Sequence, residues 1–266
     1  MSIKITTEVI KELRESTGIS VMQCKNALEE AEGNMEKALA ILKKTSSDIA
    51  LKKAGRNAKD GRVCIKTGNL PAGKAGKKSV LVTLHCETDF VSKNEDFVNL
   101  ISNLTEKVFK DGVEKMKVEA KDLIDSVIQK TGEKIELGEI YEVKGNVLGN
   151  YVHNNKIGVI VSLEGGNEEL AKDIAMHITA MKPEYLFRDE ITEDVKKTMN
   201  EIFQKEIADM NKPEDIKKKM LEGKINTYFK EKTLLDQTFI KNGDETIGQL
   251  LEKNKAKIKE VKRCSI

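Results

Sequence analysis

The chain has no tryptophan, few aromatic residues and no long apolar run. Aromatic side chains make up 4% of its 266 residues, so its cores have to be built from Ile, Leu, Val and Met. No stretch approaches the roughly 18 apolar residues of a membrane-spanning helix. The start MSIKITTEV also lacks the apolar region of a signal peptide. We therefore expect a cytoplasmic protein, with no membrane partner.

Cysteine and histidine are scarce, and there is no large excess of basic charge. The four cysteines form no Cys-x-x-Cys pair and there are three histidines, which leaves few ligands for zinc. Lys and Arg number 46 against 44 Asp and Glu, whereas nucleic-acid-binding proteins usually carry a basic excess. We predict no metal site, no cofactor and no direct nucleic-acid partner.

The motifs of enzymes are absent or broken. The segment Gly73–Ser79 (GKAGKKS) has two residues between its glycines, where a phosphate-binding loop needs four, and a strand follows it instead of a helix. His177 lies on the apolar side of a predicted helix, so we expect a core histidine. His85 has no nucleophile in a recognisable motif nearby. We predict no catalytic residues and do not expect an enzyme.

Residues 1–54 predict a small helical module and a linker. Gly18 ends a first helix, and Ser20 with Gln23 fits a capping box that begins a second helix. Apolar residues then recur at helical spacing in the second and third helices: Cys24, Ala27, Leu28 and Ala31, then Met35, Ala38, Leu39 and Leu42. Residues 46–60 are polar and basic, which indicates a linker helix that frays at Gly55.

The middle of the chain contains a weak repeat of strand, strand and helix. The first copy has strands at 61–67 and 78–86 and a helix after Asn94; the second has strands at 145–153 and 157–163 and a helix after Asn167 that carries His177 and Met181 inward. A helical stretch and a Gly-containing turn occupy 116–138 between them. Such units bury their sheet faces by stacking in layers. We place the subdomain boundary at residue 140, giving core subdomains 55–140 and 141–266.

Residues 191–231 predict an antiparallel helical hairpin inserted in the second subdomain. Its apolar stripe is narrow, which is typical of a protruding hairpin exposed on most sides. The first half of this stripe consists of Val195, Met199, Ile202 and Met210, and the second half consists of Ile216, Met220 and Ile225. Pro213 suits the first turn of the second helix. The predicted fold class is α+β.

Two stretches carry a family resemblance: KELRESTGISVMQCKNALEEAEGNMEKALAILKK (11–44) and HCETDFVSKNEDF (85–97). Shorter matches follow in order at 149–161, 177–186, 234–240 and 245–251. This set resembles bacterial translation elongation factor Ts. The resemblance implies an N-terminal three-helix module of the ubiquitin-associated type and a core of two ββα-type subdomains. It also implies a partner, the translational GTPase elongation factor Tu, for which the protein would be a guanine nucleotide exchange factor.

The resemblance also implies the partner-binding residues. Asp89 and Phe90 match the family's tip, which wedges into the GTPase near its magnesium site. Arg14, Val21 and Met22 match positions of the first module that touch the GTPase, and His153 matches an interface histidine. Helical phase alone predicts that Met22 is exposed, whereas Val21 fits either surface or core. From the residues alone, Phe90 could be an exposed anchor or could fold back into its own core.

The segment after Leu251 departs from the family pattern. Residues 252–266 hold six basic and two acidic residues, and we expect the last strand to be altered or missing and a terminal helix to be absent. One alternative is therefore a GTPase-binding relative with a scaffold or chaperone role and weak exchange activity. A second alternative is a nucleic-acid-binding protein that uses the linker and this basic segment. A hydrolase built on His85 or His177 has no motif behind it.

Overall fold

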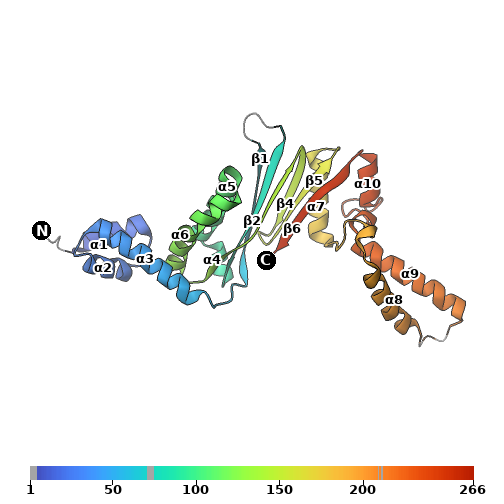
Figure 1. Ribbon diagram of the computed structural model, residues 1–266, viewed down its shortest axis with the longest axis horizontal. Helices are drawn as coiled ribbons and strands as arrows, with labels where there is room; N and C mark the ends of the chain where they lie inside the picture. The colour runs from blue at the N-terminus through green and yellow to red at the C-terminus, as the bar shows by residue number, and fades with distance from the viewer. Residues whose placement is uncertain (1–4, 71–74, 209, 211) are drawn as a thin grey trace.

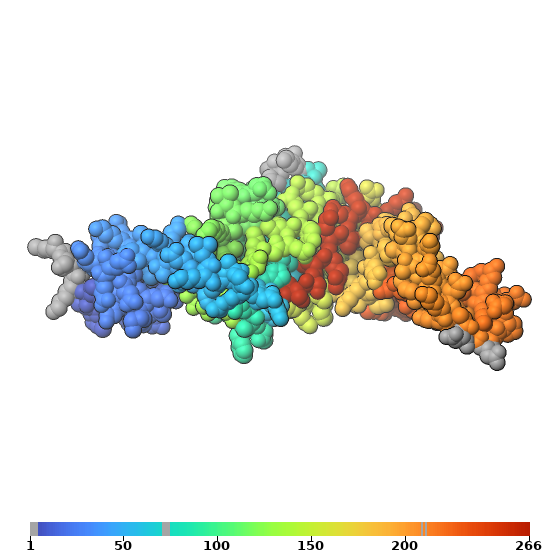
Figure 2. Space-filling model, turned by 60° about the horizontal axis from the view of Figure 1, so that its bottom comes forward, coloured from blue at the N-terminus to red at the C-terminus, as the bar shows by residue number. Residues whose placement is uncertain are grey.

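The computed structural model describes residues 5–70, 75–208, 210 and 212–266 of the chain. Helices accompany two antiparallel three-stranded sheets, so the fold is α+β. The molecule is elongated, with three helices at one end, the two sheets in the middle and a helical hairpin at the other end (Figure 1). Figure 2 shows the same order along the surface.

The N-terminal helices are α1 (Thr7–Thr17), α2 (Val21–Glu30) and α3 (Met35–Lys53). They enclose a core of Leu13, Ile19, Cys24, Ala27, Leu28, Ala31, Ala38 and Leu42. Leu39 was expected in this core but is 43% exposed. The predicted linker helix is a continuation of α3, which ends at Lys53, just before Gly55.

The first sheet has the order β1-β2-β3, with β1 (Asp60–Asn69), β2 (Lys77–Cys86) and β3 (Ile135–Gly145). Helices α5 (Glu95–Asp111) and α6 (Val113–Thr131) share a core with this sheet. Asn94 caps α5, as predicted, by accepting a hydrogen bond from the Asp96 amide. The repeat did not include β3, and the boundary predicted at residue 140 falls inside this strand.

The second sheet has the order β4-β5-β6, with β4 (Val147–His153), β5 (Ile157–Glu164) and β6 (Lys257–Ser265). Helix α7 (Glu168–Met181) packs against it, and Asn167 caps this helix as predicted. Met181 was expected inside but is 44% exposed.

The expectation of an altered or missing last strand is wrong. Strand β6 pairs with β5 from Ser265 opposite Ile157 to Lys257 opposite Glu164. Ile258 and Val261 pack against the core beneath α7, and Cys264 is buried between the sheets. The apolar residues between the lysines of this segment therefore pack on both faces of β6, against the core of α7 on one face and between the sheets on the other.

The two sheets stack face to face between the helices. Val63, Leu81, Val143, Leu148, Ile160 and Cys264 form the apolar layer between them. A side chain at Gly158 would come within 2.5 Å of Val63 and 2.9 Å of Leu81, so glycine permits the close approach of the sheets at this point. The central strand β2 is therefore buried on both faces, with Val80, Val82 and Leu84 toward α5 and α6.

The hairpin at the far end consists of α8 (Glu193–Ala208) and α9 (Glu214–Lys232). Pro213 lies at the N-cap of α9, one residue before the first turn in which we expected it. Ile202 and Ile216 are 43% and 45% exposed, contrary to the predicted stripe, whereas Ile207 and Phe229 are buried. The helices are rotated so that Phe203 meets Tyr228 edge to face, with ring centroids 5.7 Å apart.

Short elements flank the hairpin and complete the second core. The 3-10 turn η1 (Arg188–Glu190) precedes α8, and η2 (Leu234–Asp236) and α10 (Ile247–Lys253) follow α9. Glu184 and Tyr185 donate backbone hydrogen bonds to the Lys232 carbonyl at 2.9 and 3.1 Å. These bonds close the base of the hairpin. Among the described residues, no helix is long and apolar enough to cross a membrane.

Candidate partner-binding site

The short helix α4 (Asp89–Lys93) forms a tip after β2. Phe90 is 82% exposed, whereas its neighbours Val91 and Ser92 are 9% and 2% exposed. Helix α4 is thus seated on the core by one side and presents Phe90 on the other. Its segment is the teal-green projection at the lower edge of Figure 2. The possibility that Phe90 folds back into its own core is therefore wrong.

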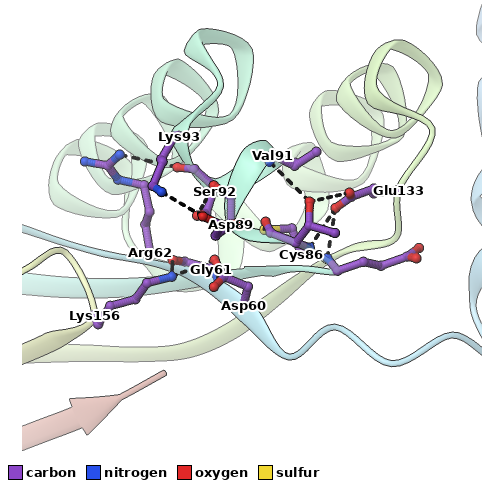
Figure 3. Close-up of polar contacts among 12 residues, drawn as sticks. Asp60, Gly61, Arg62, Cys86, Asp89, Val91, Ser92, Lys93, Glu133 and Lys156 are labelled. Atoms are coloured by element: carbon purple, nitrogen blue, oxygen red, sulfur yellow. Dashed lines mark hydrogen bonds and ion pairs between the residues drawn. The ribbon is translucent and has the colours of Figure 1, made fainter.

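Hydrogen bonds fix the start of the tip. Thr88 caps α4, with its hydroxyl oxygen accepting from the Val91 amide at 3.5 Å. The Glu133 carboxylate, from the connection between α6 and β3, accepts bonds from the Thr88 hydroxyl at 2.6 Å and from the Thr88 and Glu87 amides at 3.0 and 3.1 Å (Figure 3). The backbone where β2 turns into α4 is therefore held from a distant part of the chain.

A second set of contacts holds the end of the tip. The Arg62 guanidinium of β1 donates to the Ser92 carbonyl at 3.3 Å. Beside it, the Lys156 ammonium donates to an Asp60 oxygen at 2.6 Å and to the Gly61 carbonyl at 2.7 Å (Figure 3). Burial acts to raise the pKa of Asp60, but hydrogen bonds from Lys156 and the Gly61 amide help to hold it below its ordinary value. Asp60 is therefore a charged anchor that joins the two sheets beneath α4.

The second predicted tip residue, Asp89, is exposed and lies in the first turn of α4. One of its carboxylate oxygens is 2.7 Å from the Lys93 ammonium, one turn later in the helix. This hydrogen bond raises the pKa of Lys93 above its ordinary value. An ion pair exposed to this degree is worth little energy, so it leaves Asp89 free to exchange Lys93 for another cationic group.

The predicted residues of the first module gather at the corner between α1 and α2. Arg14 is exposed in the last turn of α1, and Val21 and Met22 are 52% and 65% exposed in the first turn of α2. Ser20 caps α2 as predicted, but the Gln23 side chain does not complete the capping box. Instead, the Gln23 side-chain oxygen accepts a hydrogen bond from the side-chain amide of Gln129 at 3.0 Å. The corner is thus tied to α6 and leaves Val21 and Met22 on the surface.

His153 ends β4 and is exposed. Its ring lies near Tyr151, whose hydroxyl is 3.2 Å from His153 Nδ1. The adjoining turn reaches β1, because the Val63 amide donates to the Asn155 carbonyl at 2.8 Å. Since Lys156 binds Asp60, the turn after His153 and the tip at α4 meet the same end of β1. Arg14, Val21 and Met22 lie on the separate module.

Of the residues considered for enzyme chemistry, His177 lies on α7, whereas His85 lies on β2 opposite Gly61. His177 is fully buried: its Nε2 is 3.0 Å from the Gln237 side-chain oxygen, and its Nδ1 accepts from the Ile240 amide at 3.3 Å. It is therefore the satisfied core histidine that we predicted.

Burial raises the pKa of the Cys86 thiol to about 12. No cluster of metal-ligating side chains occurs in the part of the chain that the structure describes, and Gly73 and Lys74 of the broken phosphate-loop pattern lie outside it.

Sequence reasoning did not identify the residues that support the tip. Glu133 lies 45 residues from Thr88, and Arg62 lies 30 residues from Ser92. Gly132, which ends α6 with a φ of 75°, marks a turn in the sequence but does not indicate what the next side chain binds. The pairing of β1 and β3 with the central strand β2 brings Arg62 and Glu133 to the tip.

Comparison with known proteins gives one consistent result. A family model described as elongation factor TS matches residues 87–266. The elongation factor Ts of Hahella chejuensis (strain KCTC 2396) is 38% identical to this chain, over 98% of it and 92% of the relative. That of Cellvibrio japonicus (strain Ueda107) is also 38% identical, over 98% and 90%. The protein of the same name from Pseudomonas aeruginosa PAO1 is 35% identical, over 96% and 88%.

Proposed function

Because the chain belongs to the elongation factor Ts family, whose members act in the elongation step of protein biosynthesis, we propose that it is a guanine nucleotide exchange factor for elongation factor Tu. The observation that carries this proposal is the tip. Phe90 is 82% exposed on a helix whose next two residues are buried. An aromatic side chain displayed in this way is typical of an anchor that fills a pocket on a partner.

Exchange would follow from binding alone. Phe90 would wedge into the GTPase near its magnesium site, and Asp89 would bring a carboxylate close to the groups that coordinate the ion. A protein that binds the nucleotide-free GTPase more tightly than the loaded one must weaken nucleotide binding by the same factor. No covalent step is needed, so we propose that the protein has no catalytic residues and is not an enzyme.

The remaining predicted residues would provide further contacts with the GTPase. Val21 and Met22 offer exposed apolar side chains beside Arg14, and a flexible methionine adapts well to a partner surface. His153 would add a contact from the second sheet. We also propose that α1–α3 form a module of the ubiquitin-associated type and that the two sheets belong to two related subdomains, with the α8–α9 hairpin inserted in the second.

The scaffold or chaperone alternative rested on the altered C-terminal segment. Strand β6 pairs with β5 along its length except at Lys259, where the register shifts, which removes the support that came from an altered or missing last strand. The nucleic-acid alternative relied on the same basic segment and on the linker, and six basic residues in a chain with nearly balanced charge are a weak indication.

The experiment is stopped-flow release of a fluorescent GDP analogue from elongation factor Tu, with and without this protein. We expect the protein to accelerate release in a concentration-dependent way. Phe90→Ala should abolish most of this acceleration, and Asp89→Ala should reduce it less, because it removes a charge and leaves the wedge. The two substitutions should not be additive, since the residues are neighbours. Binding without any acceleration would support the scaffold alternative and refute the exchange function.

A further inference from the structure

The carboxylate of Glu133 accepts three hydrogen bonds at the point where β2 turns into α4. One oxygen of Glu133 accepts the Thr88 hydroxyl at 2.6 Å, and the other accepts the amides of Glu87 and Thr88 at 3.1 and 3.0 Å. We infer that Glu133 is a positioning residue, which holds α4 in the orientation that lets Phe90 enter the partner. This inference rests on the proposed function.

The geometry of these bonds fixes both the place and the rotation of the backbone. The amides of Glu87 and Thr88 converge on one oxygen of Glu133, and the Thr88 hydroxyl reaches the other. The connection also makes a bond in the opposite sense, because the Lys134 amide donates to a Glu87 oxygen at 2.6 Å. This bond, with a smaller contribution from Arg56, holds the pKa of Glu87 below its ordinary value.

Glu133 also decides how Thr88 caps the helix. A hydroxyl has one hydrogen to donate and lone pairs to accept with. Because the Thr88 hydrogen points to Glu133, an oxygen lone pair is left for the Val91 amide at 3.5 Å. The first turn of α4, which includes Phe90, therefore takes its direction from a carboxylate outside the tip.

Phe90 itself has little else to orient it. Its side chain is 82% exposed, so the direction in which it projects depends on the backbone of α4. Arg62 holds the far end of this helix through the Ser92 carbonyl, and Glu133 holds the near end. Without Glu133, the N-terminal end of α4 would be less fixed, and Phe90 would have to be ordered during binding. The entropy cost of this ordering lowers the affinity for the partner.

The test compares Glu133→Ala and Glu133→Gln in the stopped-flow release assay. Alanine leaves two backbone donors and a hydroxyl without their acceptor, and we expect about tenfold slower stimulated release. Glutamine should stay within about twofold of the wild type, because its oxygen can accept the amides while its nitrogen donates to the Thr88 hydroxyl. In a Phe90→Ala background, Glu133→Ala should cause no further loss, since a positioning residue acts only through the group that it positions.

The matched control is Glu136→Ala. Glu136 lies three residues further on, has an exposed side chain and, among the residues that the structure describes, forms an ion pair only with Lys134, at 2.7 Å; its removal should leave release unchanged. If Glu133→Ala fails to fold, Thr88→Val and Thr88→Ser decide the matter: valine should slow release and serine should retain it. Equal release by the wild type and Glu133→Ala, or an additive loss with Phe90→Ala, would overturn the inference alone. A wild-type protein that does not accelerate release would overturn the proposed function, and the inference with it.

Discussion

Two phenylalanines, seven positions apart, allow the surface role of the tip to be separated from the stability of the fold. Phe90 is 82% exposed on α4, whereas Phe97 is fully buried in α5. Phe97 lies in the core that β2 shares with α5 and α6, together with Leu84 and Leu104. The same substitution, phenylalanine to alanine, therefore removes the same atoms from opposite environments.

The expected magnitudes follow from this burial. Truncating a buried phenylalanine costs roughly 3–5 kcal/mol of unfolding free energy, from lost transfer energy and the cavity left behind. A surface substitution usually stays within about 0.5 kcal/mol. For a chain of this size, 1 kcal/mol changes the melting temperature by roughly 2–4 °C. Phe97→Ala should thus lower the melting temperature by about 6–20 °C, and Phe90→Ala by less than about 2 °C.

Binding should show the opposite order. Truncating an aromatic anchor costs about 2 kcal/mol or more, which is roughly a thirtyfold rise in the Kd for elongation factor Tu. The folded fraction of Phe97→Ala should bind with a Kd near that of the wild type. Calorimetric melting and titration of both variants against the GTPase would check the pair. A Phe90→Ala protein that melts like Phe97→Ala but binds normally would refute our assignment of Phe90 as an anchor.

Three further predictions concern the rest of the molecule. Met22→Ala should weaken association with the GTPase by about 1–2 kcal/mol in titrations and leave the melting temperature unchanged; the reverse would mean that Met22 supports the fold. Deleting residues 192–231 should leave the cooperative unfolding transition of the core intact. The deletion keeps Lys232, whose carbonyl accepts hydrogen bonds from the Glu184 and Tyr185 amides. A deletion variant without a cooperative transition would contradict this prediction. Burial holds the pKa of His177 below 6.5, so the unfolded chain binds the proton first, and stability should be full above pH 6.5 and fall below it. Denaturant titrations of His177→Gln between pH 5 and 8 should show a flatter dependence than the wild type, and parallel curves would rule out this contribution.

Features that depend on neighbouring residues could be predicted from the sequence. Asn94 and Asn167 cap the helices that they were expected to cap. The helical phase placed Cys24 inside and Met22 outside. Each of these rests on a contact within one or two turns of a helix, where spacing determines which groups meet.

Features that depend on the partner of an element were missed. Strand β3 has no simple alternation of buried and exposed residues, because its register with β2 shifts between Val82 and Leu84, and its identity as a strand comes from that pairing. Leu39 and Ile202 have the right spacing for their helices' inner faces, yet they are exposed. A helix can rotate by one position without breaking its period, and only the packed neighbour decides which position turns inward.

The contacts of Glu133 and Arg62 beneath the tip show why the orientation of an exposed side chain is harder to predict than its exposure. The motif around Phe90 suggests a displayed aromatic residue, but its direction is set by Glu133 and Arg62, which are distant in sequence. The last turn of α6, just before Glu133, also meets the N-terminal module, because the Gln129 side-chain amide donates to the Gln23 side-chain oxygen at 3.0 Å. The corner that carries Met22 and the tip that carries Phe90 are therefore both bonded to one short segment, 129–133. If Met22 and Phe90 both contact elongation factor Tu, as we propose, this common support would present them already oriented, and the second contact would form at a high effective concentration.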